Sequence, residues 1–302
     1  MGDSIKTQEI RIPVPWGHIA AKTWGDEKDK AVLAIHGRMD NAGAFDRLIP
    51  LLPTSFYYIC VDLPGHGRSS HFPPYVPLYT VTYLMVYKLI MQYFQRNSYI
   101  VIGHSYGGHI GFLFAQTYPH LVEKLVMLDT VHTIPVPSKN FKYYLADKID
   151  NNLELQKKLK TGKQPTYTYD EALNRLLNGR QVAPLKVEAA KPLLERGVEP
   201  AENGRFKFTL DQRMKCYIDP LHDNQYAVAT MKWNRVSCPI LFILASESTL
   251  QQTVMKPIIQ VLKKWRNVTI KYVTGDHDVH NNTPEVVAPH IIRFLLKTKS
   301  KL

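Results

Sequence analysis

The sequence contains few cysteines, and their number and spacing exclude two classes of small structured domain. The 302 residues include three cysteines, Cys60, Cys216 and Cys238, an odd number without the short spacing of a zinc site. Cys60 lies in an apolar, strand-like run, and we interpret it as a small core residue. We therefore expect neither a disulfide framework nor a zinc-binding module, and the count fits a reducing compartment.

Long apolar runs are also missing from the chain. No segment reaches the ~18 consecutive apolar residues that a transmembrane helix requires. The longest apolar runs, such as 240–245, have the length of a strand. The first residues, MGDSIK, lack the apolar core of a secretory signal. We therefore expect no transmembrane segment and no secretion.

Acidic residues are outnumbered by basic ones. The 38 Lys and Arg against 26 Asp and Glu give a formal net charge of +12. Such an excess can indicate a nucleic acid, an anionic lipid or an acidic substrate as partner. The basic residues are scattered, however, with no run of five or six and no recognisable nucleic-acid-binding module. We interpret them as a solvated basic surface and predict no nucleic-acid partner.

Short apolar runs alternate with segments of helical periodicity. This alternation is typical of a mostly parallel, twisted sheet covered by helices on both faces. Strands are predicted at 31–36, 56–62, 99–104, 124–129, 239–246 and 267–273, and helices at 77–95, 106–118 and 284–297. Between them the periodicity is helical, and only 205–210 weakly resembles a strand. The sequence thus predicts an α/β core, residues 1–131 and 237–302, interrupted by a helical cap or lid at 132–236.

One motif indicates a nucleophile. Gly103-His104-Ser105-Tyr106-Gly107 matches the pattern G-x-S-x-G, between a predicted strand and a predicted helix. A serine in this position projects from a sharp, strained turn, and the glycine on each side relieves the crowding. Gly108 permits still closer packing of the helix. We predict that Ser105 is the nucleophile.

Serine needs a base to remove its proton at neutral pH. Proteins with this motif carry the base late in the chain, and two histidines follow the predicted strand 267–273. His277 comes directly after a Gly-Asp turn, and Pro284 can begin the last helix seven residues later. His280 is further from the strand end, where it would support the loop by packing or a hydrogen bond. We predict His277 as the base.

A third residue, an acid, must orient the imidazole and stabilise its charged form. Its usual place is the loop after the penultimate strand, but no aspartate occurs there. Glu247 lies one position before the expected one. Asp129 ends the strand after the nucleophile helix, and both loops open on the same edge of the sheet. We favour Asp129, with Glu247 as the alternative and Asp276 or Asp278 behind it. Asp129 could instead merely cap the turn that follows.

Acyl transfer also needs N–H donors directed at the developing oxyanion. One is the backbone N–H of Tyr106, the residue after the nucleophile. The second is expected from the loop after the strand 31–36, where the N–H of Arg38 is best placed. The Arg38 side chain has two interpretations: it binds an anionic group of the substrate, or it holds the loop through Asp40 or Asp62. Four other polar residues are expected to fix these loops: His36, Asn41, His66 and Arg68.

The last three residues, Ser300-Lys301-Leu302, form a specific pattern. A free C-terminal Ser-Lys-Leu is the address that the peroxisomal import receptor reads. Basic residues, Lys297 and Lys299, flank it after a helix that could end at Leu296. The tail predicts the peroxisomal matrix, with the cytoplasm as the alternative if it is only a basic, frayed end.

Together these segments resemble the α/β-hydrolase superfamily and, more narrowly, the serine hydrolase-like proteins of animals, in a peroxisomal-type member. The resemblance covers nearly the whole chain, least clearly the insertion, and rests on 36–53, 56–58, 65–71, 103–107, 124–130 and 275–280. It implies a hydrolase with a catalytic triad and poorly defined substrates. The lack of an aspartate on the usual acid loop is also similar to this family, which favours Asp129.

The resemblance also narrows the reaction. Dehalogenases and epoxide hydrolases of this fold use an aspartate nucleophile, whereas this chain has a serine and resembles esterases, lipases and thioesterases. We expect Ser105 to attack a carboxylic ester or thioester with an apolar acyl chain, without a metal or organic cofactor. The basic surface could attract an anionic head such as coenzyme A. The alternative is a non-catalytic protein of this fold that binds a small apolar ligand, and an acyltransferase or lyase would use the same residues.

Overall fold

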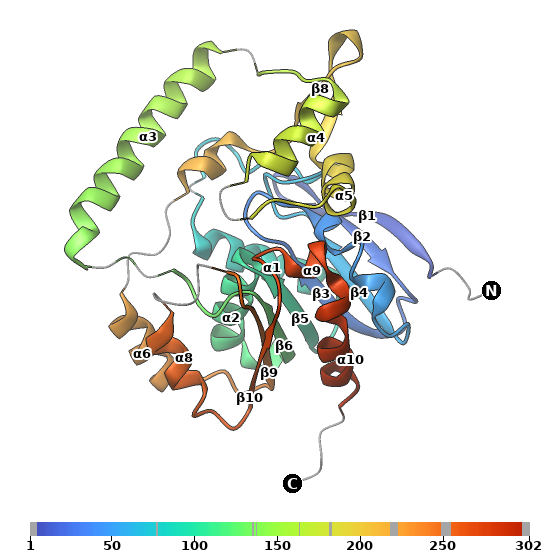
Figure 1. The fold of residues 1–302 in the computed structure, drawn as a ribbon, viewed down its shortest axis with the longest axis vertical. Helices are drawn as coiled ribbons and strands as arrows, with labels where there is room; N and C mark the ends of the chain where they lie inside the picture. The colour runs from blue at the N-terminus through green and yellow to red at the C-terminus, as the bar shows by residue number, and fades with distance from the viewer. Residues whose placement is uncertain are drawn as a thin grey trace.

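The structure, a computed structural model, describes residues 5–76, 78–134, 136, 138–162, 164–180, 183–217, 223–248 and 255–297. An eight-stranded sheet forms its centre (Figure 1). Its strands in spatial order are β1 (Thr7–Val14), β2 (Gly17–Trp24), β4 (Phe56–Val61), β3 (Lys30–Ile35), β5 (Tyr99–His104), β6 (Val122–Leu128), β9 (Ile240–Ala245) and β10 (Val268–Val273). All pairs from β4 to β10 are parallel, and only β1 and β2 run antiparallel to their neighbours.

The parallel strands are apolar on both sides because both faces of the sheet are covered. Every residue of β4, β5 and β9 is buried. Successive side chains of a strand point to opposite faces, so Leu33 of β3 packs beneath α1 (Thr80–Phe94) and α2 (Tyr106–Thr117) while Val32 packs beneath α10 (Ala288–Leu296). The predicted α/β architecture, with helices on both faces of a mostly parallel sheet, is confirmed.

The six predicted strands are all present, and their ends lie within two residues of the prediction. The helix predicted at 77–95 is α1, and Pro77 lies outside the described residues. The predicted last helix is present as α10, but its predicted start at Pro284 was wrong: a 3-10 turn (Pro284–Val286) comes first, and α10 begins at Ala288. Pro289 explains the division, because proline lacks an N–H to continue a preceding helix and fits the first turn of a new one.

The antiparallel hairpin of β1 and β2 was not predicted. β1 forms an edge of the sheet, and Ile12 is its one buried residue. It therefore lacks the continuous apolar run that marks the central strands. The signal that it does carry is the spacing of Ile10, Ile12 and Val14 at every second position, with Glu9 and Arg11 between or beside them, which is typical of a half-exposed strand.

The insertion between β6 and β9 is mainly helical. It contains α3 (Phe141–Thr161), α4 (Tyr169–Asn178), α5 (Val187–Gly197), α6 (Asn224–Trp233) and a small hairpin of β7 (Val198–Pro200) and β8 (Phe206–Phe208). β8 lies within the weak strand candidate 205–210. The long helix α3 stands apart from the body at the periphery (Figure 1), and none of its residues from 141 to 160 is buried. The division into core and cap at 132 and 236 stays a prediction.

Two helices of the insertion pack closely on the core. α5 contacts the 3-10 turn Ala42–Phe45, which follows β3, and α6 packs against α8 (Lys256–Leu262). Buried residues of α6 belong to the same apolar cluster as α1 and α2. The described residues include no helix that is both long and apolar enough to cross a bilayer.

Candidate active site

Ser105 occupies a strained turn between β5 and α2. Its backbone has φ 48° and ψ −114°, a conformation that costs a non-glycine residue about 1–3 kcal/mol. The glycines on either side permit the turn. A Cβ on Gly103 would lie 2.5 Å from the backbone of Gly108, and one on Gly107 would lie 2.3 Å from the carbonyl oxygen of Ile35. The predicted elbow geometry is therefore present at Ser105.

Asp129 lies directly after β6 and contacts the predicted base. His277 Nδ1 donates a hydrogen bond to Asp129 Oδ2 over 2.6 Å, and the backbone N–H of Ala245 donates to Oδ1 over 2.8 Å. Both side chains are buried, with 6% exposure for His277 and none for Asp129. Because Nδ1 is engaged with the acid, Nε2 is the nitrogen of His277 that remains to accept a proton.

The other candidate acids point elsewhere. Glu247 is exposed, and its backbone N–H donates to Gly275. The carboxylate of Asp276 accepts hydrogen bonds from the N–H of Asp278 and from Asn282. Asp278 itself faces an arginine, described below. Among the four acids considered from the sequence, Asp129 is the one whose carboxylate lies against the imidazole of His277.

Opposing effects set the protonation of His277. Burial by itself lowers the pKa of the imidazole. The hydrogen bond and the negative charge of Asp129 outweigh this effect, and Asp278 and Asp40 act in the same direction, so the pKa of His277 is raised above its ordinary value. The site therefore favours a positive charge on His277, as a base that has just accepted a proton requires.

The second side of the site is the loop after β3. Gly37 permits its course, because a Cβ there would lie 2.8 Å from His104 Nδ1. His36 bridges two backbone groups: Nε2 accepts from the N–H of Leu63, so Nδ1 donates to the carbonyl of Gly37. His66 accepts from the N–H of Met39, which has φ 70°. These contacts shape the segment that carries the N–H of Arg38.

The far end of that loop is also held. The side chain of Asn41 accepts from the N–H of Gly43 and donates to the carbonyl of Leu193 in α5. The partner donor from the sequence, the N–H of Tyr106, belongs to the first residue of α2. The N-terminal end of a helix favours negative charge, which suits an oxyanion at this place.

One of the two interpretations of the Arg38 side chain was that it holds the loop by binding Asp40 or Asp62. That interpretation was wrong because both acids bind other arginines: Asp40 pairs with Arg180 and Asp62 with Arg196. Arg38 is instead exposed, and its guanidinium lies 6.0 Å over the ring of Tyr217.

Sequence reasoning missed two further residues of the site, Arg180 and His104. Arg180 reaches in from the insertion, donating to Asp40 and to both carboxylate oxygens of Asp278. His104 stacks between two other histidines, with ring centroids 4.0 Å from His280 and 4.8 Å from His277. The predicted packing role of His280 matches this stack. No periodic or motif signal marks Arg180, which lies in a loop after α4.

One group of described residues has the composition of a metal site. Asp40, His104 and Asp278 each offer a ligand atom, and these atoms lie within 4.8 Å of one another. The guanidinium of Arg180 already supplies positive charge to the two carboxylates. The arrangement therefore resembles a cation site in which the cation is a side chain.

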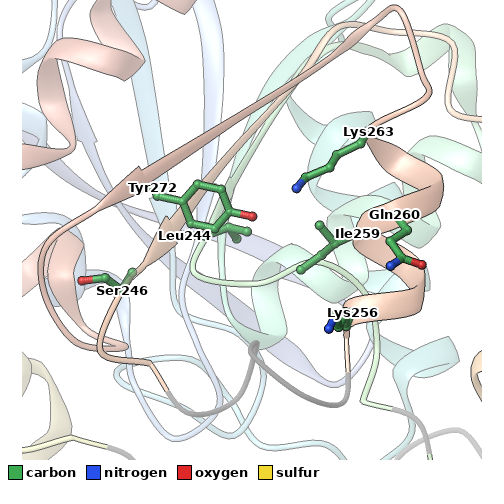
Figure 2. Close-up of a pocket in the computed structure, with 8 residues that line it drawn as sticks. Leu244, Ser246, Lys256, Ile259, Gln260, Lys263 and Tyr272 are labelled. Carbon is green, nitrogen blue, oxygen red and sulfur yellow. The ribbon is translucent and has the colours of Figure 1, made fainter.

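A surface hollow of about 310 Å³ lies beside the site rather than over it. Figure 2 shows Leu244 of β9 and Tyr272 of β10 on one side and Ile259 and Lys263 of α8 on the other. Its lining includes neither Ser105 nor His277. We assign it no part in the chemistry.

Known proteins resemble the chain along most of its length. A family model described as alpha/beta hydrolase fold matches residues 30–191. Serine hydrolase-like protein 2 of Homo sapiens is 31% identical, over 95% of this chain and 93% of the relative. A serine hydrolase-like protein of Danio rerio is 32% identical, over 95% of this chain and 88% of the relative.

Solved structures share the fold. A hypothetical protein of Pseudomonas aeruginosa PAO1 has a TM-score of 0.82 at 25% identity, covering 96% of this chain and 99% of that one. The thioesterase domain from the curacin biosynthetic pathway has a TM-score of 0.76 at 20% identity, covering 97% of this chain and all of that one. At such low identity the thioesterase shows a shared fold and no more.

The assignment of the acid predicts a difference between two variants. Asp129→Asn should slow the labelling of Ser105 by a fluorophosphonate probe by roughly 10³–10⁴-fold, because a neutral partner neither fixes the tautomer nor stabilises the imidazolium. The matched control, Glu247→Gln, alters an exposed carboxylate and should label like the wild type. Loss of labelling in Glu247→Gln with normal labelling in Asp129→Asn would contradict the assignment.

The labelling rates of the wild type and of Asp129→Asn should also differ in their dependence on pH. Only neutral His277 can accept a proton, so the wild-type labelling rate should rise with pH through a midpoint above about 6.5, the ordinary histidine value. In Asp129→Asn the charge that raises the pKa of His277 is lost, so the midpoint should move to lower pH.

Proposed function

Because this chain belongs to the alpha/beta hydrolase fold family, we propose that it is a serine hydrolase that cleaves a carboxylic ester or thioester through an acyl-enzyme. The observation that carries the proposal is the 2.6 Å hydrogen bond between His277 Nδ1 and the buried Asp129, in a chain whose Ser105 occupies a strained elbow. In this proposal Ser105 is the nucleophile, His277 is the base and Asp129 is the acid that orients the base.

The reaction follows from the roles. Ser105 Oγ attacks the carbonyl carbon while Nε2 of His277 takes the hydroxyl proton. The backbone N–H groups of Arg38 and Tyr106 receive the oxyanion. Collapse of the tetrahedral intermediate expels the alcohol or thiol, which leaves with the proton from His277. Water then attacks the acyl-enzyme with the help of the same base, the acid is released and Ser105 regains its proton.

The choice of ester or thioester rests on family likeness. Structures of the same fold include a thioesterase domain and an esterase of Mycobacterium tuberculosis, whereas the relatives of higher identity are named only serine hydrolase-like. We expect the helical insertion to cover the acyl group, since insertions of this length in a compact domain commonly act as lids.

The test is turnover of aryl esters and acyl-CoA esters, with Ser105→Ala as the inactive control. Removing the nucleophile should reduce turnover to the residual level that binding and the oxyanion donors support, a loss of about 10⁶-fold. Fluorophosphonate should modify Ser105 in the wild type. No turnover together with no labelling would favour the alternative, a protein that binds a small apolar ligand unchanged.

We further propose that the substrate carries an anionic group, which Arg38 binds. The two acids near this loop already have arginine partners. Arg38 is exposed over Tyr217, whose ring packs 5.1 Å from that of Tyr106, the neighbour of the nucleophile. The guanidinium is thus linked through Tyr217 to the residue that follows Ser105, and its charge is not committed to either acid.

Two esters of similar length separate this proposal from a solvated arginine. p-Nitrophenyl hemisuccinate carries a carboxylate, and p-nitrophenyl valerate is neutral. Arg38→Met should lower kcat/KM for the hemisuccinate about 10–100-fold, the strength of a hydrogen bond to a charged group, and for the valerate far less. Arg38→Lys should retain part of the preference. Equal losses for both esters would refute the proposal.

For a chain that ends at Leu302, we also propose import into the peroxisomal matrix. Ser300, Lys301 and Leu302 lie outside the described residues, so the support is the tripeptide itself. An N-terminal fluorescent fusion should coincide with a peroxisomal marker and become diffuse when Leu302 is removed. A diffuse signal from the intact fusion would leave the cytoplasm as the location.

A further inference from the structure

Arg180 joins two loops that are distant in sequence. Its Nη1 lies 2.5 Å from Asp40 Oδ1, and its Nη2 lies 2.9 and 3.0 Å from the two carboxylate oxygens of Asp278. Each carboxylate is 2% exposed and the Arg180 side chain 17%. The guanidinium is therefore largely enclosed, and both of its terminal nitrogens bind a carboxylate.

The two acids lie beside residues that the proposed reaction uses. Asp278 is the neighbour of His277, and Asp40 is two residues from Arg38, whose N–H is an oxyanion donor. Arg180 comes from neither loop, since it follows α4 in the insertion. A single side chain of the insertion thus spans the base and the oxyanion side of the site.

The two histidines that stack beside these acids supply no positive charge. Burial lowers the pKa of His104 well below its ordinary value and that of His280 to about 3, so both imidazoles are neutral. Burial also raises the pKa of Asp278, to about 6. At Asp40 burial by itself raises the pKa, but the charge and the hydrogen bond of Arg180 are the main effects that together bring it below its ordinary value. Without Arg180, two buried carboxyl groups would face each other uncompensated, a strongly unfavourable arrangement.

We propose that Arg180 is a positioning residue: the insertion supplies it to hold the His277 loop and the oxyanion loop in their reacting arrangement. This inference rests on the proposed function. It implies that the insertion completes the catalytic site as well as covering it, because displacement of Arg180 would release both loops together.

The primary test is steady-state kinetics of Arg180→Met on an ester that the wild type hydrolyses. A misplacement of reacting groups by about 1 Å can cost 10²-fold in rate, so kcat should fall by about that factor while KM changes little. The matched control is Arg175→Met, which removes an exposed arginine of α4 that lies over Tyr167 and should leave both constants unchanged.

Rescue separates positioning from a general loss of structure. Arg180→Lys keeps one positive charge but lacks the two-sided fork of arginine, so its kcat should lie between those of the wild type and Arg180→Met. Millimolar guanidinium should restore part of the kcat of Arg180→Ala and have no effect on the wild type. The thermal unfolding transition of each variant is measured first. Kinetics are then compared at a temperature at which every variant is folded.

The outcomes are distinct. Wild-type kcat in folded Arg180→Met, or a kcat loss that neither lysine nor guanidinium relieves, would overturn the role of Arg180 and leave the hydrolase proposal intact. Absence of turnover and of Ser105 labelling in the wild type would overturn both.

Discussion

The carboxylate of Asp129 is the group on which the arrangement of the site depends. One oxygen accepts from the N–H of Ala245 on β9, and the other accepts from His277 on the loop after β10. The backbone N–H of Asp129 donates to Ile243, also on β9. A buried carboxylate is costly unless it is hydrogen-bonded, and here the bonds that satisfy it also join β6 to β9 and orient the base. The register of the sheet and the geometry of the site are thus set by the same contacts.

The sequence predicted correctly those features that depend on residues close together in the chain. The apolar runs marked the parallel strands because those strands are buried on both faces, and the motif around Ser105 marked the turn because only glycine fits beside it. Asp129 could be favoured, but not separated from Glu247, because the choice depends on which strand end faces His277. This depends on the order of the strands in the sheet, in which β9 lies next to β6.

Arg180 could not be foreseen for a related reason. It lies 140 residues from Asp40 and 98 from Asp278, and it sits outside any element whose periodicity would point it inward. β1 was missed because an edge strand buries one face at most and so lacks a continuous apolar run. The contacts of Arg180 are long-range, whereas helix and strand patterns are local. Sequence reasoning therefore pointed to Ser105 and His277 more directly than to the groups that hold them.

The insertion is tied to the core by charge as well as by apolar packing. Besides Arg180, the buried Arg196 of α5 binds Asp62, whose carboxylate also accepts the N–H groups of Ala42 and Arg68. Buried ion pairs add little net stability, yet losing one partner costs about 3–5 kcal/mol. The two arginines thus specify how this part of the insertion docks, in contrast to α3, which buries none of its residues from 141 to 160.

These buried arginines limit how such a protein can diverge. An insertion transplanted from a relative without them would leave Asp40, Asp62 and Asp278 without their arginine partners, so this segment is not freely exchangeable. Exposed positions such as Arg38, which forms no ion pair with these acids, are freer to be substituted. The arginines of the insertion and the acids that they bind on the core loops would therefore be retained or lost together.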